Sequence, residues 1–485
     1  MRKLLETRRV FVIMVGVGIF TMAVRWVTDP DVWWHLRTGQ LILQNHSVFH
    51  SDPYSFTRAG QPWVDHEWLS QVVIFALYRL AGWAGLMAAF SSVITVALLL
   101  VFLRCPRRPY VAGLVTVWGA VASVPSWGSR PQMFSFLLAS MFLFILERSD
   151  ERPNLLWWTP ALMLLWANLH AGYALGIALL VLFFLGDILD ATFGFREWPE
   201  TTRRLRMLAL VIATCLAVVP LNPYGLRMYS YPLETLRSRA MPLYINEWFS
   251  PDFHQHKYLA SLLMMLTTLV LPVFSPRRLR PREILLLLVT TYAALRSVRH
   301  IPIYVLVAVP VVSALLQGCL ENFGVAHRFE SAPTALTQSK MLLNALLLAG
   351  FLGFAALRFN WVLQRQGQAE QKAFPAEAVA FLSMRRPPSP LLNHYNWGGY
   401  FIWKLYPEYK VYIDGRADVY GDAFMDDFAS TYYVKGEAWS GPLMKWGVRT
   451  VVLPPDAPLV TALQAMPDWR IIHADTQAVI LTKTR

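Results

Sequence analysis

Charged residues and cysteines are both scarce in this sequence of 485 residues. Only 15% of the residues are charged and 55% are hydrophobic, which excludes an ordinary soluble protein and indicates a membrane protein with several spans. The three cysteines, Cys105, Cys215 and Cys319, lie in or beside apolar runs, so we expect no disulfide framework. The first apolar run lacks a small-residue cleavage site, which favours a retained span over a signal peptide.

The net charge of +13 is distributed in a way that argues against a nucleic-acid partner. Basic residues cluster in short segments between apolar runs, which is the pattern that sets the orientation of membrane proteins. Alternate loops are then cytoplasmic, beginning with the segment that holds Arg2, Lys3, Arg8 and Arg9. We therefore expect a cytoplasmic N-terminus, and an odd number of spans places the C-terminal segment outside.

Apolar runs long enough to cross a bilayer occur about eleven times along the chain. They cover residues 10–27, 85–103, 110–127, 132–146, 155–169, 173–192, 205–221, 258–274, 284–295, 301–320 and 341–357. The pattern predicts a mainly α, polytopic membrane domain over residues 1–360, with a long first outer loop at residues 28–83. In this loop, residues 69–80 favour an amphipathic helix that lies on the membrane surface.

The segment from residue 374 to 485 differs in kind, because its apolar runs are short and alternate between strand-like and helix-like pieces. The predicted strands are 391–392, 410–413, 448–453 and 478–481, and the predicted helices are 376–384, 400–405, 423–432 and 459–466. A segment of this length can bury a small core. We expect a compact extracytoplasmic α/β domain, joined to the membrane domain by an exposed linker at 361–373.

Polar chemistry is densest directly after the first apolar run. Asp29 and Asp31 flank Pro30, which we expect to end the helix after Asp29, so that both acids lie on an irregular loop. The rings of Trp33 and Trp34 suit the boundary between water and lipid. The acids could simply cap and solvate a helix end. Alternatively, one carboxylate can act as a general base, and the pair can hold a divalent metal against a phosphate.

A second polar group, His66 and Glu67, lies later in the same loop between two tryptophans. An acid at the start of an interfacial helix is favoured by the helix dipole alone. The pair could equally bind a metal or orient an acceptor. We predict Asp29, Asp31, His66 and Glu67 as catalytic residues, with Asp31, His66 and Glu67 as ligands of an optional divalent metal. No other cofactor is expected.

Three arginines, Arg130, Arg296 and Arg299, stand at the predicted outer ends of spans, where the positive-inside rule disfavours them. Their side chains could extend to lipid head groups. A guanidinium also grips a phosphate through two hydrogen bonds, so we predict these arginines and His300 as a phosphate-binding set. The predicted substrate-binding residues, from this and neighbouring outer loops, are Trp33, Trp34, His35, His170 and Glu247.

Two polar turns stand out in the C-terminal segment. One contains Trp397-Gly398-Gly399-Tyr400, and the other runs Ile413-Asp414-Gly415-Arg416-Ala417-Asp418. Turns at strand ends often contact ligands, but turn chemistry with an internal Asp–Arg bridge explains them as well. The second explanation is favoured for Asp418, and both stay open for Asp414 and Arg416.

The acidic Asp29-Pro30-Asp31 motif, the long first loop with an amphipathic helix, the many spans and the C-terminal outer domain together resemble the GT-C class of membrane glycosyltransferases. This class includes protein O-mannosyltransferases, aminoarabinose transferases of lipid A and oligosaccharyltransferases. The arrangement Asp-Pro-Asp-x-Trp-Trp-His-Leu, with the Trp-Gly-Gly-Tyr and Ile-Asp-Gly-Arg runs, is most similar to poorly characterised bacterial members. The Trp-Gly-Gly-Tyr turn lacks the aspartate of the oligosaccharyltransferase acceptor motif, so no role is transferred to it.

The resemblance implies an inverting transfer of a sugar from a polyprenyl-phosphate donor, on the outer face of the bacterial inner membrane. Asp29 would activate the acceptor, Asp31 would support it, and Arg296 and Arg299 with Arg130 would hold the donor phosphate. The expected partners are this lipid-linked sugar, membrane lipids and an acceptor that is a protein, a lipid or a polysaccharide. The alternatives are a non-catalytic membrane subunit or a transporter with a partner-binding outer domain, and a glycan ligase or polymerase of the same class.

Overall fold

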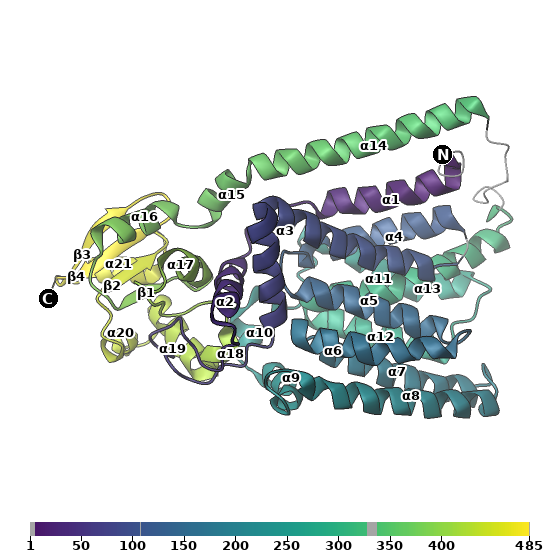
Figure 1. Ribbon diagram of the computed structural model, residues 1–485, viewed down its shortest axis with the longest axis horizontal. Coiled ribbons are helices and arrows are strands. Elements are labelled where there is room, and N and C mark those ends of the chain that lie inside the picture. The colour runs from purple at the N-terminus through teal and green to yellow at the C-terminus, as the bar shows by residue number, and fades with distance from the viewer. Residues whose placement is uncertain (1–4, 107, 327–336, 485) are drawn as a thin grey trace. The chain divides into compact units, whose positions relative to one another are not determined.

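The computed structural model of the protein describes residues 5–106, 108–326 and 337–484. These residues form a mainly helical protein with one small sheet near the C-terminus (Figure 1). They divide into two compact units, which we describe separately. The helical unit comprises Met1–Arg25, Met87–Tyr229 and Asn246–Val362, and the mixed unit comprises Trp26–Leu86, Ser230–Ile245 and Leu363–Arg485.

The helical unit is built from the long apolar segments. Its α-helices are α1 (Thr7–Ala23), the later part of α3 (Trp68–Arg104), α4 (Pro109–Ser123), α5 (Gln132–Arg148), α6 (Thr159–Leu169), α7 (Tyr173–Thr192), α8 (Trp198–Val218), α11 (Leu259–Phe274), α12 (Pro281–Arg296), α13 (Ile301–Asn322) and α14 (Gln338–Gln364). Short 3-10 turns lie at Val124–Ser126, Pro153–Trp158, Val219–Leu221, Asn246–Trp248, His256–Tyr258 and Val298–His300. Helix α13 is at the centre of the packing, because it contacts α4, α11 and α12.

Within the described residues, seven helical segments are long and apolar enough to cross a membrane. They are Trp68–Arg104, Pro109–Ser126, Tyr173–Thr192, Trp198–Leu221, His256–Phe274, Val298–Asn322 and Gln338–Gln364. Four other predicted spans are helical but shorter: α1 and α5 have 17 residues each, α12 has 16 and α6 has 11. The count of about eleven spans therefore stays a prediction.

Two boundaries in the first hundred residues are set by local backbone. Helix α1 ends at Ala23, and the chain is non-helical from Val24 to Asp29, so the expectation that Pro30 terminates this helix is wrong. Helix α3 is interrupted at Ala81 and Gly82, where Gly82 has φ 56° and ψ −144°. A positive φ is easy for glycine. The break separates an early helix from an apolar one, as the two predicted segments at 69–80 and 85–103 require.

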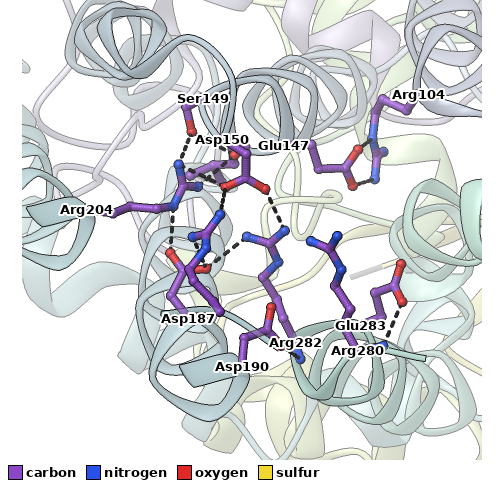
Figure 2. A network of polar contacts seen from close by, with 12 residues as sticks. Arg104, Glu147, Ser149, Asp150, Asp187, Asp190, Arg204, Arg280, Arg282 and Glu283 are labelled. Carbon is purple, nitrogen blue, oxygen red and sulfur yellow. Dashed lines mark hydrogen bonds and ion pairs between the residues drawn. The ribbon is translucent and has the colours of Figure 1, made fainter. Parts of the chain in front are cut away.

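A network of buried ion pairs joins several helices of the helical unit (Figure 2). Arg282, at the start of α12, lies 2.8 Å from Asp150 and 2.9 Å from Asp187 of α7. Arg204 of α8 binds the same two acids, at 3.1 and 2.7 Å. Burial alone would raise the pKa of Asp150, but the arginines hold it well below its usual range. Arg204 and Arg282 lie in short basic segments of the kind that set membrane orientation, and their ion pairs show that they also have a structural role.

The mixed unit contains the helices that the loops and the C-terminal segment form. They are α2 (Val32–Asn45), the early part of α3, the end of α9 (Arg227–Arg237), α10 (Met241–Tyr244), α15 (Gln366–Ala373), α16 (Ala376–Arg385), α17 (Gly398–Leu405), α18 (Ala417–Tyr420), α19 (Asp422–Tyr432), α20 (Gly441–Lys445) and α21 (Pro458–Gln464), with a 3-10 turn at Tyr395–Trp397. The predicted linker at 361–373 is helical, and Gln366 exchanges two 2.9 Å hydrogen bonds with the backbone of Val27.

The sheet has the strand order β1-β2-β4-β3, with β1 parallel to β2 and the other pairs antiparallel. Its strands are β1 (Leu391–Asn393), β2 (Thr450–Leu453), β3 (Trp469–Ala474) and β4 (Val479–Lys483). Three predicted strands are present, and β3 was not predicted. The strand expected at 410–413 is wrong: Val411 makes an isolated bridge to Ser55 of the first loop, so this segment joins no sheet strand.

Candidate active site

The two acids of the Asp-Pro-Asp motif lie on one turn of the mixed unit, directly before α2. A side-chain oxygen of Asp29 accepts the backbone N–H of Asp31 at 3.0 Å. Oδ1 of Asp31 accepts the indole N–H of Trp34 at 3.1 Å. Both acids are partly buried. The sequence motif therefore folds into a turn in which each carboxylate is oriented by a neighbour.

The residues after the motif form helix α2, which the sequence analysis did not predict. Trp33, Trp34 and His35 are 0%, 6% and 2% exposed, so the two tryptophan rings lie in the interior of the mixed unit. The ring of Trp33 packs edge-on against Phe374 and Tyr400, at 5.3 and 4.9 Å between centroids. The expectation of two interfacial rings is thus wrong, because Phe374 and Tyr400 cover Trp33 and Trp63 of the first loop lies against Trp34.

Glu67 bridges two imidazoles. Its Oε2 lies 3.5 Å from Nε2 of His35, and its Oε1 lies 3.2 Å from Nε2 of His66. His35 comes from α2 and Glu67 from the turn before α3, so the two predicted polar motifs of the first loop meet here. A carboxylate between two imidazoles can accept, hold or pass a proton.

His66 also faces residues from two later segments. Its ring lies 4.5 Å from the ring of Tyr231, measured between centroids, and the hydroxyl of Tyr231 donates to Oδ2 of Asp418 at 3.0 Å. Burial lowers the pKa of His66, but the carboxylates of Glu67, Asp418 and Asp65 raise it by more. The neighbouring carboxylates therefore stabilise the charged form of the imidazole relative to a histidine without them.

Asp65, next to His66, is a buried acid of a different kind. It is 1% exposed, its Oδ1 accepts a hydrogen bond from the side chain of Gln71 at 2.5 Å, and its Oδ2 has no hydrogen-bond partner among the described residues. Burial raises the pKa of Asp65 to about 7. This carboxyl can therefore gain or lose a proton near neutral pH.

Arg416 ties the C-terminal segment to the first loop. Its guanidinium binds both oxygens of Asp414, at 2.8 and 2.7 Å, and lies 2.8 Å from Asp52. The rings of Tyr54 and Trp63 lie 4.9 and 4.6 Å from the guanidinium carbon. All the charged atoms of this group are inaccessible to solvent or nearly so. The internal Asp–Arg bridge that the sequence left open is thus present, with a third charge from the loop.

The helical unit holds all four predicted phosphate-binding residues. Arg130 forms an ion pair with Glu247, whose backbone carbonyl accepts a 2.8 Å hydrogen bond from Ser297. The guanidinium of Arg299 lies 3.3 Å from Nε2 of His170 and 5.5 Å from the ring of Trp248.

On the other side of its ring, Nδ1 of His170 is 2.8 Å from the hydroxyl of Ser135, which also accepts from Trp166. His300 packs edge-on against Trp248 at 6.4 Å between centroids. Arg296 differs from the other two arginines, because its side chain is exposed at the end of α12. Arg299 and His300 thus both lie against the ring of Trp248, and Arg299 also contacts His170. Arg296 remains at the surface.

Solved structures with a similar fold cover most of this chain. The oligosaccharyltransferase of Archaeoglobus fulgidus in its apo form aligns with a TM-score of 0.56 over 91% of this chain and 69% of that chain, at 11% identity. The same enzyme tethered to an acceptor peptide with the NVT sequon gives 0.58 over 93% and 69%, at 12% identity. ArnT from Cupriavidus metallidurans bound to undecaprenyl phosphate gives 0.51 over 97% of both chains, at 14% identity.

The chain has the fold of the GT-C glycosyltransferases. No family model matches the sequence, and no curated protein matches it either. The likeness therefore concerns the fold. Together with the apolar helices, the GT-C fold indicates an integral membrane protein.

On this GT-C fold, His66 and Glu67 are the residues best placed for a divalent metal. Imidazole nitrogen and carboxylate oxygen are donors that such ions accept, and these two groups face each other at 3.2 Å. The donor set fits an optional metal ion. Asp31 already uses Oδ1 to accept from Trp34, and its place as a third ligand stays a prediction.

Sequence reasoning missed three residues of the mixed unit's polar groups. Asp65 directly precedes the predicted pair His66 and Glu67 in the printed sequence, and this position could have drawn attention to it. Asp418 was assigned to turn chemistry, although Tyr231 binds it. Tyr231 itself gave no signal, because it is one aromatic residue in an amphipathic helix and only its place in the fold brings it to His66.

Proposed function

We propose that the protein is an inverting glycosyltransferase that takes a sugar from a polyprenyl-phosphate donor. The observation that carries the proposal is the oriented Asp29–Asp31 pair next to α2, on a chain with the GT-C fold. Two of the similar structures contain a lipid phosphate, dolichol-phosphate in one and undecaprenyl phosphate in the other. The predicted membrane orientation puts the reaction on the extracytoplasmic face of a bacterial inner membrane.

The chemistry of inversion needs one base and one stabilised leaving group. Asp29 accepts the proton of the acceptor hydroxyl or amine as that atom attacks the anomeric carbon. The bond from the anomeric carbon to the phosphate oxygen breaks on the opposite side, and the electron pair leaves with the lipid phosphate. Asp31, whose carboxylate is fixed by Trp34, supports the base electrostatically.

The leaving phosphate requires positive charge. Arg130 and Arg299 are already held by Glu247 and His170, so their guanidinium groups lose little freedom when they bind an anion. Arg296 and His300 complete the proposed phosphate-binding set. If a divalent metal is bound, Asp31, His66 and Glu67 would hold it, and it would supply further charge to neutralise the phosphate.

The buried aromatic residues of α2 have a different part in this proposal. Trp33 is fully enclosed and supports the turn that carries the acids. Trp34 orients Asp31 and His35 orients Glu67. The acceptor could be a protein, a lipid or a polysaccharide, and a ligase or polymerase that moves a whole glycan would use the same residues.

Lipid binding is the first test, because it requires no knowledge of the sugar. Purified protein is incubated with undecaprenyl phosphate and examined by native mass spectrometry. We expect one bound lipid per chain, and we expect the Arg130→Ala/Arg299→Ala double variant to lose it. Arg278→Ala is the matched control, because Arg278 is an exposed arginine of the same unit with no described ion pair. Equal binding by all three proteins contradicts the assignment of these arginines.

Transfer is the second test. Membranes are prepared from cells that express the protein and are given radiolabelled sugars linked to undecaprenyl phosphate. The label is then measured in the protein, lipid and polysaccharide fractions. Asp29→Asn should lower transfer by about 10²–10⁴-fold, the usual contribution of a general base. Asp456→Asn, an exposed aspartate of the same unit, should leave transfer unchanged. Wild-type transfer by both Asp29→Asn and Asp31→Asn would show that the pair is not catalytic.

A further inference from the structure

The carboxylate of Asp31 lies directly against the backbone of Gly415. A methyl group built on Gly415 would overlap Oδ1 of Asp31 and would lie only 3.0 Å from its Cγ. Real Cβ atoms essentially never lie closer than 3.0 Å to another heavy atom, and the distance to Oδ1 is well below this limit. Position 415 therefore accepts a glycine and no other residue while Asp31 keeps its observed orientation.

The turn that carries Gly415 is fixed on both sides. Asp414 and Arg416 form a buried bidentate ion pair, and Asp52 adds a 2.8 Å contact to the same guanidinium. The carbonyl of Gly415 accepts from the hydroxyl of Tyr395 at 3.2 Å. If a side chain were added at position 415, this turn could not move away, so the short side chain of Asp31 would have to turn aside.

A second glycine makes a comparable but different contact. A methyl group on Gly399, in the Trp-Gly-Gly-Tyr turn, would overlap the backbone carbonyl of Pro30. A backbone atom cannot rotate out of the way as a carboxylate can. The two glycine-containing motifs of the C-terminal segment are therefore both packed on the Asp29–Asp31 turn, one against its backbone and one against its side chain.

We propose that Gly415 is a positioning residue for Asp31: the Asp414–Gly415–Arg416 turn and the indole of Trp34 together fix the plane of this carboxylate. The inference rests on the proposed function for its catalytic meaning. It also assigns a role to the C-terminal segment. Its Ile-Asp-Gly-Arg and Trp-Gly-Gly-Tyr motifs pack against the turn that carries the two acids.

A double-mutant cycle on thermal stability tests the contact without any substrate. The variants are Gly415→Ala, Asp31→Ala and the two together, in the full-length protein in detergent. Asp31→Ala removes the atoms that the new methyl group would meet, so it should restore most of the midpoint lost in Gly415→Ala. Gly399→Ala should lose more, and Asp31→Ala should not restore it, because the carbonyl of Pro30 remains.

The matched control is Gly441→Ala. A Cβ at Gly441 meets no atom within 4 Å, so its midpoint should stay near that of the wild type and should not respond to Asp31→Ala. If the losses from Gly415→Ala and Asp31→Ala simply add, Gly415 does not position Asp31 and the proposal is overturned.

The radiolabel assay described above gives the second readout. For Gly415→Ala we expect kcat to fall by about 10²-fold, the cost of misplacing a reacting group by about 1 Å, with the KM for the donor unchanged. A purely structural role would lower the amount of active protein and would leave kcat per folded molecule intact. Full kcat in Gly415→Ala refutes the proposal. If the wild type transfers no sugar, the proposed function fails, and the stability cycle still decides the contact.

Discussion

Replacing Arg416 by methionine should destabilise the mixed unit more than any single change at its surface. Two carboxylates, those of Asp52 and Asp414, are fully buried and share this one guanidinium. Burial would lower the pKa of Arg416, but the two acids raise it far above its usual value, so the group is charged throughout the accessible pH range. Without Arg416, the fold must keep two neighbouring buried acids with no compensating charge.

The expected cost follows from what each acid retains. Removing one partner of a buried ion pair costs about 3–5 kcal/mol. Asp52 keeps three other donors, the backbone N–H groups of Tyr54 and Ser55 and the hydroxyl of Ser55. Asp414 keeps two donors, the hydroxyl of Tyr420 and the backbone N–H of residue 416. It also loses two guanidinium hydrogen bonds where Asp52 loses one contact, so the larger share of the loss should come from Asp414.

A second substitution makes the reasoning testable. Arg416→Met/Asp414→Asn removes one charge of each sign and leaves Asp52 with its own donors, so it should recover most of the stability lost in Arg416→Met. Urea-dependent pulse proteolysis, read by an epitope at the C-terminus, measures both variants against Arg470→Met, which changes an exposed arginine. The argument is refuted if Arg416→Met is no worse than Arg470→Met, or if the double variant is no better than the single one.

Three further predictions use the same protein and the same readouts. Asp65 has its pKa raised to about 7 by burial, so between about pH 4 and 7 the folded chain binds a proton that an unfolded aspartate has released. Stability should therefore fall as the pH rises through this window, and thermal midpoints of Asp65→Asn should lack that fall. Gln366→Ala should cost about 1–3 kcal/mol in urea, because it leaves the buried N–H and C=O of Val27 unpaired. Arg282→Met should cost the helical unit about 1–3 kcal/mol in thermal stability, because Asp150 and Asp187 lose one of their charged hydrogen-bond donors and keep Arg204, whereas Arg280→Met should cost almost nothing.

The apolar runs predicted the helices of the helical unit because burial in lipid or protein demands long uninterrupted hydrophobic segments. The polar starts of helices were harder to predict. Helix α8 begins at Trp198, seven residues before the predicted span, since Pro199 at its first turn and the acid Glu200 favour a helix start that hydropathy does not register. Helix α1 ends at Ala23, where Val24 is extended although no glycine or proline lies among residues 24–29 to mark the end in the sequence.

Helix α2 was not predicted because the polar and aromatic residues of this segment were considered before its hydrophobic periodicity. Val32, Trp33, Leu36 and Ile42 are buried at helical spacing, yet the charged and aromatic neighbours suggested an interfacial loop. In the C-terminal segment, β3 was missed for a related reason: it is an edge strand whose Arg470 is exposed, so its pattern is not apolar. A short strand-like run suggested a strand at 410–413, and among the described residues this run has a single bridge, from Val411 to Ser55.

The candidate site shows where sequence reasoning stops. Asp29, Asp31, His66 and Glu67 could be named because acids and imidazoles in one loop are visible in the order of residues. Their partners could not be named in the same way, since Gly415 and Asp418 lie more than 300 residues away along the chain.

Asp31 fits against position 415 because glycine has no side chain there. Neither composition nor residue spacing in the sequence indicates that this glycine makes room for that carboxylate. A glycine in a polar turn looks like turn chemistry until its neighbour is known. The acid motif and the glycine motif are therefore informative only together. In the proposed enzyme, the C-terminal segment acts on the acid motif through the packing of Gly415 against Asp31.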